Sequence, residues 1–401
     1  MRISTLQLYA QGVSSILDQQ ANVAKYQQQV STGKRIQTPA DDPAGAARVL
    51  QLGQALGQNT QYQTNADAVN SRLTQEESAL TSAGNNLQRV RDLVVQGLNA
   101  PLGNQDRASI AQEIRQRLDE MKGLANSRDG QGDYLFGGYK TKGQPFTTDA
   151  SGQVVYNGDQ GTRYLQISPD RQVADSDPGQ NVFMGIRNGN GTFVANPASA
   201  NTGTGSILPG SVVDSSAYQP DSFRIVFTSA NSYNVVDDTT GSTVQSGQAY
   251  QSGAKISFNG IETSISGQPA AGDTFTVAPS TSQSVFTTLD NIATAMETPT
   301  GTPANAAKLT SLLNRSLSEI DQASSNFVNI RTSIGARQNA IDSQKQINSD
   351  VNVQLQTDQS TLQSADMVQA VSDLARSMNS LQASQEAFAK TQGLSLFQYI
   401  K

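Results

Sequence analysis

The chain of 401 residues is mildly acidic, with a formal net charge of −6, and only 15 % of its residues are charged. It contains no Cys, His or Trp, which excludes disulfides, thiolate chemistry and the common histidine and cysteine metal sites. The length allows two or three domains, and the acidic balance argues against nucleic acid as the main partner.

The amino terminus predicts neither a cleaved signal peptide nor a membrane anchor. The stretch MRISTLQLYAQGVSSIL has an early Arg but lacks an apolar core of about seven residues. No stretch of the sequence approaches the apolar length of a transmembrane helix. We therefore expect no membrane insertion.

Residues 3 to 31 predict a helix with a weak apolar stripe. Apolar or small side chains recur at three- and four-residue spacing, at Leu6, Ala10, Val13, Leu17 and Ala24. Only Asp18 and Lys25 carry charge in this segment, which favours a helix packed among neighbours over a solvated surface helix. A disordered polar tail in the free monomer is the alternative.

A turn follows this helix and leads into two more. Gly33 is suited to a left-handed C-cap position, and Asp42-Pro43 is suited to the start of a helix. The pattern then predicts one helix from about Ala44 to Ala100 and a third helix capped by Asn104. Narrow apolar stripes joined by short turns are typical of an elongated bundle.

The helical rhythm is lost between residues 131 and 284. Short β-rich runs alternate with turn residues there, namely VVY, FRIVF, YNVV, KISF, IETSI and TFTV. Asn157-Gly158 and Asn259-Gly260 each follow such a run, and Asn-Gly between β-branched runs is a strong hairpin signal. We expect an all-β insert that forms a small sandwich or barrel.

Helical spacing resumes at residue 285 and, after a break at Pro299 to Pro303, continues to the C-terminus. A heptad row is formed by Ile320, Phe327, Ile334, Ile341, Asn348, Leu355 and Leu362. The stripe changes register near Met367 and continues through Met367, Val371, Leu374, Met378, Leu381 and Phe388. At about 1.5 Å per residue, one unbroken helix would exceed roughly 120 Å. Two or three shorter helices joined by turns are the alternative.

These patterns predict an α+β multidomain fold, in which an elongated bundle of long helices from both chain ends carries an all-β domain inserted in the middle. The expected domains are a terminal helical domain (1–40 and 365–401), a long-helix bundle (41–130 and 285–364) and an inserted β domain (131–284).

Candidate catalytic and ligand-binding patterns are weak throughout the sequence. Asp41-Asp42 and Asp237-Asp238 are better explained as a helix cap and a turn. The stretch around Asp175 and Asp177 lacks the ligand number of a calcium loop, and the NGNG turn at Asn188 lacks the Lys of a phosphate loop. We therefore assign no catalytic, cofactor-binding or metal-binding residue.

Four short stretches resemble the flagellin superfamily. STGKRIQTPADDPAGAARVL (residues 31–50) resembles the N-terminal signature of bacterial flagellins, and the stretch from Met367 through LQASQEAFAKTQGLSLFQYI is similar to the C-terminal half of that pattern. GDYLFGGYKTKGQPF (Gly132 to Phe146) resembles the hook-associated protein 3 family, which forms the hook–filament junction. AAGDTFTVAPS (Ala270 to Ser280) is similar to a stretch that recurs in hook-associated proteins.

The resemblance implies a structural subunit without catalysis or cofactor. Its terminal helices would pair in the inner tube of an axial filament, with the β insert facing outward. Its partners would be identical subunits in a ring, hook-associated protein 1, flagellin, the flagellar type III export apparatus and an export chaperone. It would be extracellular, secreted without cleavage. Flagellin itself is one alternative, and a glycan-binding or glycan-cleaving protein acting through the β insert is another, because carboxylate glycosidases need no His.

The terminal stripes are expected to be completed by neighbouring subunits. Burial of six large side chains offsets little more than the conformational entropy of ordering the two ends, so the isolated pair should be marginal. We expect residues 1 to about 35 and 370 to 401 to be mobile in the monomer and helical in the assembly. The predicted subunit contacts are Leu6, Val13, Leu17, Met367, Val371, Leu374, Met378, Leu381 and Phe388.

Overall fold

The computed structural model describes residues 5–99 and 102–393. By its internal contacts the chain divides into two compact units. The terminal unit comprises Met1–Thr64 with Gln344–Lys401, and the central unit comprises Asn65–Ser343. The domain boundaries expected at residues 40, 130, 284 and 364 remain predictions.

Helices account for both ends of the chain, as the periodicity predicts. They are α1 (Thr5–Thr32), α2 (Pro43–Asn99), α3 (Asn104–Ala125), α4 (Val285–Glu297), α5 (Pro303–Gln363) and α6 (Met367–Gly393). A single helix from residue 303 to the C-terminus is wrong, because α5 ends before Ser364. The Asp366 carboxylate accepts the Val368 and Gln369 N–H groups (2.9 and 3.1 Å) and so caps a new helix.

The other helix ends follow the predicted turn chemistry with one correction. Gly33 has a φ of +68°, and the Asp42 carboxylate accepts the Gly45 N–H group at 2.9 Å. Asn104, however, does not cap α3, because Gly103 occupies the cap and donates its N–H group to Asp106 at 3.1 Å.

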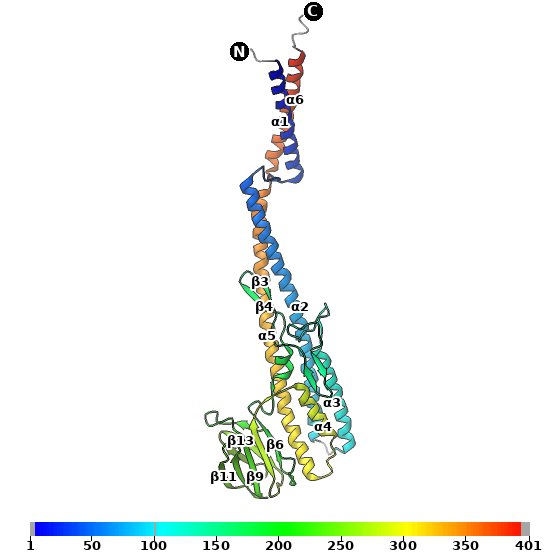
Figure 1. Ribbon diagram of the computed structural model, residues 1–401, viewed down its shortest axis with the longest axis vertical. Coiled ribbons are helices and arrows are strands. Elements are labelled where there is room, and N and C mark those ends of the chain that lie inside the picture. Colours follow the sequence, from blue (N-terminus) through cyan, green and yellow to red (C-terminus); the bar gives the residue numbers. More distant parts are fainter. Residues whose placement is uncertain (1–4, 100–101, 394–401) are drawn as a thin grey trace, which may run out of the picture. The chain divides into compact units, whose positions relative to one another are not determined.

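In the terminal unit, α1 and α6 lie side by side (Figure 1). Residues 43–64 of α2 and 344–363 of α5 form a second pair with a polar seam. Asn59 donates to the Asn348 carbonyl oxygen (2.6 Å) and to the Asn352 side chain (2.8 Å). Asn348, which interrupts the apolar heptad row, is only 2 % exposed. Such a buried amide fixes the alignment of two helices at some cost in stability.

The central unit has a helical core built from α2, α3, α4 and α5. Apolar positions of α2 at three- and four-residue spacing are buried there, namely Ala66, Val69, Leu73, Leu80, Ala83, Leu87, Val90 and Val94. They meet Leu313, Ile320, Phe327, Ile334 and Ile341 of α5. Ion pairs such as Arg89–Glu113 (2.7 Å) lie on the outer surface.

Irregular chain between α3 and the β domain also enters this helical core. It contains the hairpins β1–β2 (Phe146–Thr148, Val154–Tyr156) and β3–β4 (Tyr164–Ser168, Arg171–Ala174), and the π-helical turn η1 (Gln180–Met184). Phe183 stacks its ring against Phe286 of α4 and contacts Phe327 of α5 edge-on. Asn157-Gly158 does not connect a hairpin as predicted, because β2 pairs back with β1.

The β domain is a sandwich of two sheets with its own core (Figure 1). One sheet has the order β11-β10-β9-β14-β6, with strands Thr243–Ala249, Ser232–Asp237, Phe223–Ser229, Thr274–Pro279 and Phe193–Pro197. The other contains β12 (Lys255–Phe258), β13 (Ile261–Ser266), β7 (Ser206–Ile207) and β8 (Ser211–Val212). The Asn259-Gly260 hairpin between β12 and β13 is confirmed, with φ values of +44° and +75°.

Candidate assembly surface on the terminal helices

A backbone pairing aligns the two terminal helices where the chain turns. Lys34 and Ser364 form an antiparallel bridge. The Arg35 N–H group donates to the Gln363 carbonyl oxygen (2.7 Å), and the Ala365 N–H group donates to the Gly33 carbonyl oxygen (2.8 Å). The end of α1 and the start of α6 therefore lie side by side, and the two helices run antiparallel to each other from this point.

Side chains reinforce this corner, which we define as residues 33–42 with 362–366. The Arg35 guanidinium donates to the Leu362 carbonyl oxygen (3.2 Å) and to Asp42 (3.3 Å). The Asp41 carboxylate accepts the Thr38 N–H group (2.9 Å) and pairs with Lys25 (3.0 Å). These contacts, with the Thr38 bond foremost, hold the pKa of Asp41 well below its usual range. Asp42 therefore caps α2, as predicted, whereas Asp41 stabilises the turn that precedes the helix.

One face of each terminal helix packs against the other. The Tyr9 and Phe388 rings lie 5.3 Å apart, and a Cβ atom at Gly12 would come within 2.7 Å of the Phe388 ring. The α1 row is partly covered and contains Gly12, Ile16, Gln19, Val23, Tyr26 and Val30. The α6 row contains Ala370, Leu374, Ser377, Leu381, Ser384 and Phe388. Small and polar residues alternate with large ones, so this contact buries little apolar surface.

A second apolar row on each helix is exposed. On α6, the exposed fractions of Met367, Val371 and Met378 are 44, 51 and 55 %, and on α1 that of Leu17 is 58 %. Among side chains that the structure describes, fifteen large apolar ones are exposed, and ten of them belong to the terminal unit, although it is the smaller one. Six of these ten lie on α1 and α6 and four on α2 and α5, so exposed apolar side chains are concentrated in the terminal unit as a whole.

The two exposed rows lie on the same side of the helix pair. Successive residues turn by about 100° around a helix, which places the Leu17 row about a quarter to a third of a turn from the face that α1 presents to α6. The Met378 row has a similar offset in the same rotational sense. Because the helices are antiparallel, equal offsets bring both rows to one side. Charged Asp18, Asp373 and Arg376 fall on the opposite side, so the pair is amphipathic as a unit.

The nine predicted contact residues divide into two groups. Leu374, Leu381 and Phe388 lie in the row that packs on α1. Leu17, Met367, Val371 and Met378 are exposed, and Val13 is partly covered. The Leu6 side chain lies outside the described part of the structure. Their role between subunits stays a prediction.

Sequence reasoning missed the row of α1 that packs inside the chain. Ile16, Val23 and Tyr26 were not selected because the Leu6–Leu17 row has the same three- and four-residue spacing. A helix with two apolar rows has no single apolar stripe that identifies its packed face. Gly12, which lets the Phe388 ring approach the α1 backbone closely, is a signal for that face in the sequence.

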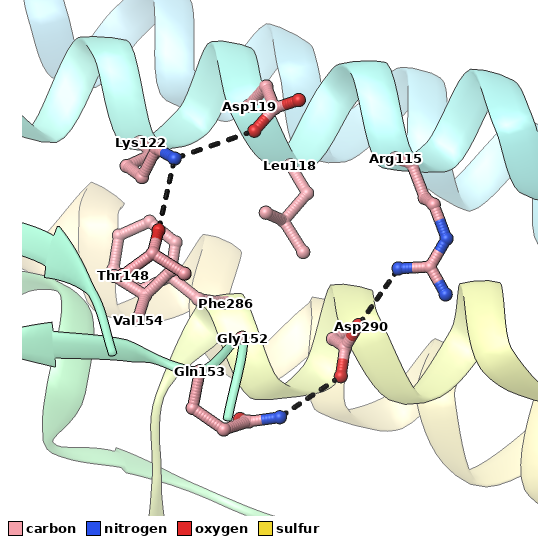
Figure 2. Close-up of a pocket in the computed structure, with 10 residues that line it drawn as sticks. All are labelled: Arg115, Leu118, Asp119, Lys122, Thr148, Gly152, Gln153, Val154, Phe286 and Asp290. Atoms are coloured by element: carbon pink, nitrogen blue, oxygen red, sulfur yellow. Dashed lines mark hydrogen bonds and ion pairs between the residues drawn. The ribbon is translucent and has the colours of Figure 1, made fainter. Parts of the chain in front are cut away.

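Two cavities in the central unit are lined by charged side chains that are already paired within the chain. One of about 220 Å³ lies between α3, α4 and the β1–β2 hairpin, and Figure 2 shows Arg115 pointing toward Asp290 there (3.1 Å) and Lys122 toward Asp119 and Thr148. The other, of about 570 Å³, is lined by Arg72 and Arg163, which both pair with Asp175. Each cation that lines these cavities meets a carboxylate of the same chain, which indicates a structural role.

Residues 5–99 and 102–393 contain neither a membrane-spanning helix nor a metal-binding cluster. No helix among them is long and apolar enough to cross a membrane. No group of three or more acidic side chains among them is arranged to hold a metal ion.

Comparison with known proteins places this architecture. Residues 3–141 match the family model described as the bacterial flagellin N-terminal helical region. Residues 196–279, within the β domain, match the D2-like domain of flagellar hook-associated protein 1. Paired terminal helices with a β domain between them therefore define a flagellin-like subunit.

Individual relatives show which family of flagellin-like subunits the chain resembles. Flagellar hook-associated protein 3 of Salmonella typhimurium is 36 % identical over 186 residues, a match that covers 46 % of this chain and 58 % of that relative. The crystal structure of Xanthomonas campestris FlgL is 38 % identical with a TM-score of 0.73, covering 77 % of this chain and 99 % of that one. Hook-associated protein 3 from Legionella pneumophila is 31 % identical with a TM-score of 0.74, covering 78 % and 98 %. The chain belongs to the flagellar hook-associated protein 3 family.

Proposed function

We propose that this chain is a structural subunit of the bacterial flagellum at the hook–filament junction, and that it assembles through its terminal helix pair. The observation that carries this proposal is the amphipathic character of the pair. One side exposes Leu17, Met367, Val371 and Met378, and Asp18, Asp373 and Arg376 lie on the other side. Covering this side is favourable because each buried large side chain contributes about 1.5–3 kcal/mol.

Identical subunits are the first partners that we propose for this surface. The nine contact residues then act at two levels. Leu374, Leu381 and Phe388 align α6 on α1 within one subunit, and the exposed row of Leu17, Met367, Val371 and Met378 contacts the next subunit. Leu6 and Val13 extend the same row along α1. A lipid surface fits less well, because no cluster of basic residues flanks this row in the described helices.

Hook-associated protein 1 and flagellin are the partners proposed at the two ends of the assembly. The match of the β domain to a hook-associated protein 1 domain and that of residues 3–141 to the flagellin model support a shared mode of packing. The proposal includes export through the flagellar type III apparatus with an export chaperone, and an extracellular location in the flagellum. The role is structural rather than enzymatic.

Flagellin and a glycan-acting surface protein remain the competing functions. Purified flagellin grows long filaments by itself, whereas a junction subunit does not, so polymerisation of the pure chain separates these two. A glycan-binding or hydrolysis screen of the full chain tests the glycan-acting function, which requires the β domain to bind sugar.

The assembly role is tested with Met378→Asp in a strain that lacks the native subunit. The charge falls on the exposed side, so we expect a folded subunit that is not retained at the junction and cells that do not swim. Ser372→Asp is the matched control, because Ser372 is exposed on the same helix but outside the apolar row. Normal retention of the Met378→Asp subunit would contradict the proposal.

A further inference from the structure

The chain crosses between the helical core and the β domain through a narrow neck. Strands β5 (Ile186–Arg187) and β15 (Ser282–Gln283) pair with each other at this crossing. Asn188 donates its N–H group to the Thr281 carbonyl oxygen (3.0 Å), and Ser280 donates its N–H group to the Thr192 carbonyl oxygen (2.9 Å). A neck of two strands would by itself allow the β domain to swing as a hinged body.

A polar row on α5 contacts the β domain beyond this neck. Its members recur at three- and four-residue spacing along one face of the helix and are Lys308, Ser311, Arg315, Glu319 and Gln322. This row, which we call the latch, runs alongside the apolar row that builds the helical core. One helix thus presents two faces to two different cores.

The latch holds the β domain at sites that are far apart in its sequence. Ser311 accepts the Ile207 N–H group of β7 (3.1 Å), and Lys308 donates to the Ser199 carbonyl oxygen (2.6 Å). Arg315 donates to the Asn196 side chain of β6. A body held at three separate points and at its neck cannot rotate without breaking several bonds together.

Two residues of the latch, Glu319 and Gln322, bind the two chain segments of the neck. The Glu319 carboxylate accepts the Gly189 N–H group (3.3 Å) and the Gln283 amide (3.2 Å), one from each crossing segment. Gln322 donates to the Asn190 carbonyl oxygen (3.1 Å). Arg315 forms an ion pair with Glu319 (3.2 Å).

Burial makes these bonds costly to break. Ser311 and Glu319 are 1 % and 3 % exposed, and the Arg315 side chain is 17 % exposed. Opening the hinge would break the bonds that Glu319 accepts from Gly189 and Gln283, and the bond that Ser311 accepts from Ile207. We therefore propose that α5 works as a latch that fixes the orientation of the β domain on the helical core. In an assembly, the direction in which the β domain projects is then set by α5 and not by the neck.

The test measures the orientation directly. The chain has no Cys, so Thr332→Cys on α5 and Gln248→Cys on β11 place two spin labels at chosen sites. We expect a narrow distance distribution in the otherwise unchanged full-length chain. The triple variant Arg315→Ala, Glu319→Ala, Gln322→Ala removes both members of the buried ion pair together, so that neither charge is left alone. It should broaden the distribution at least about twofold.

A matched control and a second readout separate a hinge from unfolding. Ser325→Ala with Asn329→Ala changes exposed polar residues of the same helix and should leave the distribution narrow. The amides of Gly189 and Ser280 should exchange slowly in the unchanged chain and about tenfold or more faster in the triple variant, with both cores still protected. A broad distribution or rapid neck exchange in the unchanged chain would overturn the proposal, as would a triple variant that stays narrow.

Discussion

At the scale of single residues, Glu76 is a fully buried carboxyl of the central unit that its surroundings do not fully satisfy. Glu76 of α2 is fully buried, and one of its oxygens accepts the Asp177 N–H group at 3.1 Å. The other oxygen has no hydrogen-bond partner among the described residues. Burial, reinforced by the nearby Asp177 carboxylate and opposed by Arg337 and Arg72, raises the pKa of Glu76 well above its usual value.

The raised pKa makes stability depend on pH in a defined direction. The folded chain keeps the Glu76 proton to higher pH than the unfolded chain. The loss of folding stability that Glu76 causes is therefore absent below the unfolded pKa near 4.5 and grows as the pH rises above it. Glu76→Gln should therefore raise the free energy of unfolding by about 1–3 kcal/mol at neutral pH, and by much less near pH 4. Denaturant unfolding at the two pH values measures this difference.

Glu77→Gln is the matched control for this experiment. Glu77 is partly exposed and pairs with Arg331 at 2.7 Å, so its loss should cost about 0–1 kcal/mol at neutral pH. Equal effects of the two substitutions, or a Glu76→Gln gain that persists unchanged at low pH, would show that folding does not raise the pKa of Glu76.

Gly12 of α1 is a position where the neighbouring Phe388 ring leaves no room for a larger side chain. Gly12→Ala would place a Cβ atom 2.7 Å from the Phe388 ring, a clash that costs about 1–3 kcal/mol against a gain of about 1 kcal/mol in helix propensity. We expect faster amide exchange in α1 and α6. At Gly57 of α2 no atom lies within 4 Å of the added carbon, so Gly57→Ala should instead stabilise by about 0.5–1 kcal/mol. A Gly12→Ala chain with slower exchange would show that the contact has room.

At the scale of elements, periodicity predicted the helices well and marked a change of register near Met367, but it favoured one continuous helix there. Heptad spacing places α2, α3, α4 and the start of α5 within a residue or two. A stop between the two helices was not favoured because residues 364–366 contain neither Pro nor Gly. It depends on Asp366 and on backbone pairing with Gly33 and Arg35, which lie more than three hundred residues away.

Among the strands, β-rich runs such as TFTV located β14 even though its partners are distant, whereas the turn signal was right only where the pairing partner is local. The Asn259-Gly260 hairpin was predicted correctly because β12 and β13 pair with each other. Strand β6 falls in a stretch rich in Gly, Ser and Asn, and it forms by pairing with β14, some eighty residues later. The aromatic residues around Phe146 and Phe183 likewise join the helical core through contacts that no short window reveals.

Leu381→Asp tests whether the face of α6 that packs on α1 acts separately from the β domain. The charge would enter the partly covered row opposite α1, so we expect α1 and α6 to separate and assembly to be lost. The β domain should stay folded, because its core is formed entirely by residues between Phe193 and Val277. Amide exchange resolves the two regions in one experiment. Normal assembly of this variant would show that pairing of α1 with α6 is not required.

At the scale of the whole molecule, family membership and interface chemistry come from different observations. The short motifs around residues 31–50 and 132–146 point to the flagellin superfamily, and the relatives confirm the hook-associated protein 3 family. The assembly surface needed the structure, because both rows of α1 have helical spacing and only packing shows which one remains exposed. The predicted residues Leu17 and Val371 lie on that exposed side.

The measurement that tests the account most directly is thiol accessibility in the assembled junction. The chain has no Cys, so Met378→Cys introduces a single thiol on the apolar side of the terminal pair, and Ser372→Cys introduces one outside the apolar row. Both thiols should react with a polar maleimide in the free subunit. In isolated hook–filament junctions we predict that the thiol at position 378 is protected and that the one at 372 reacts more readily. Equal and rapid labelling at both positions in the assembly would contradict the claim that neighbouring copies cover this surface.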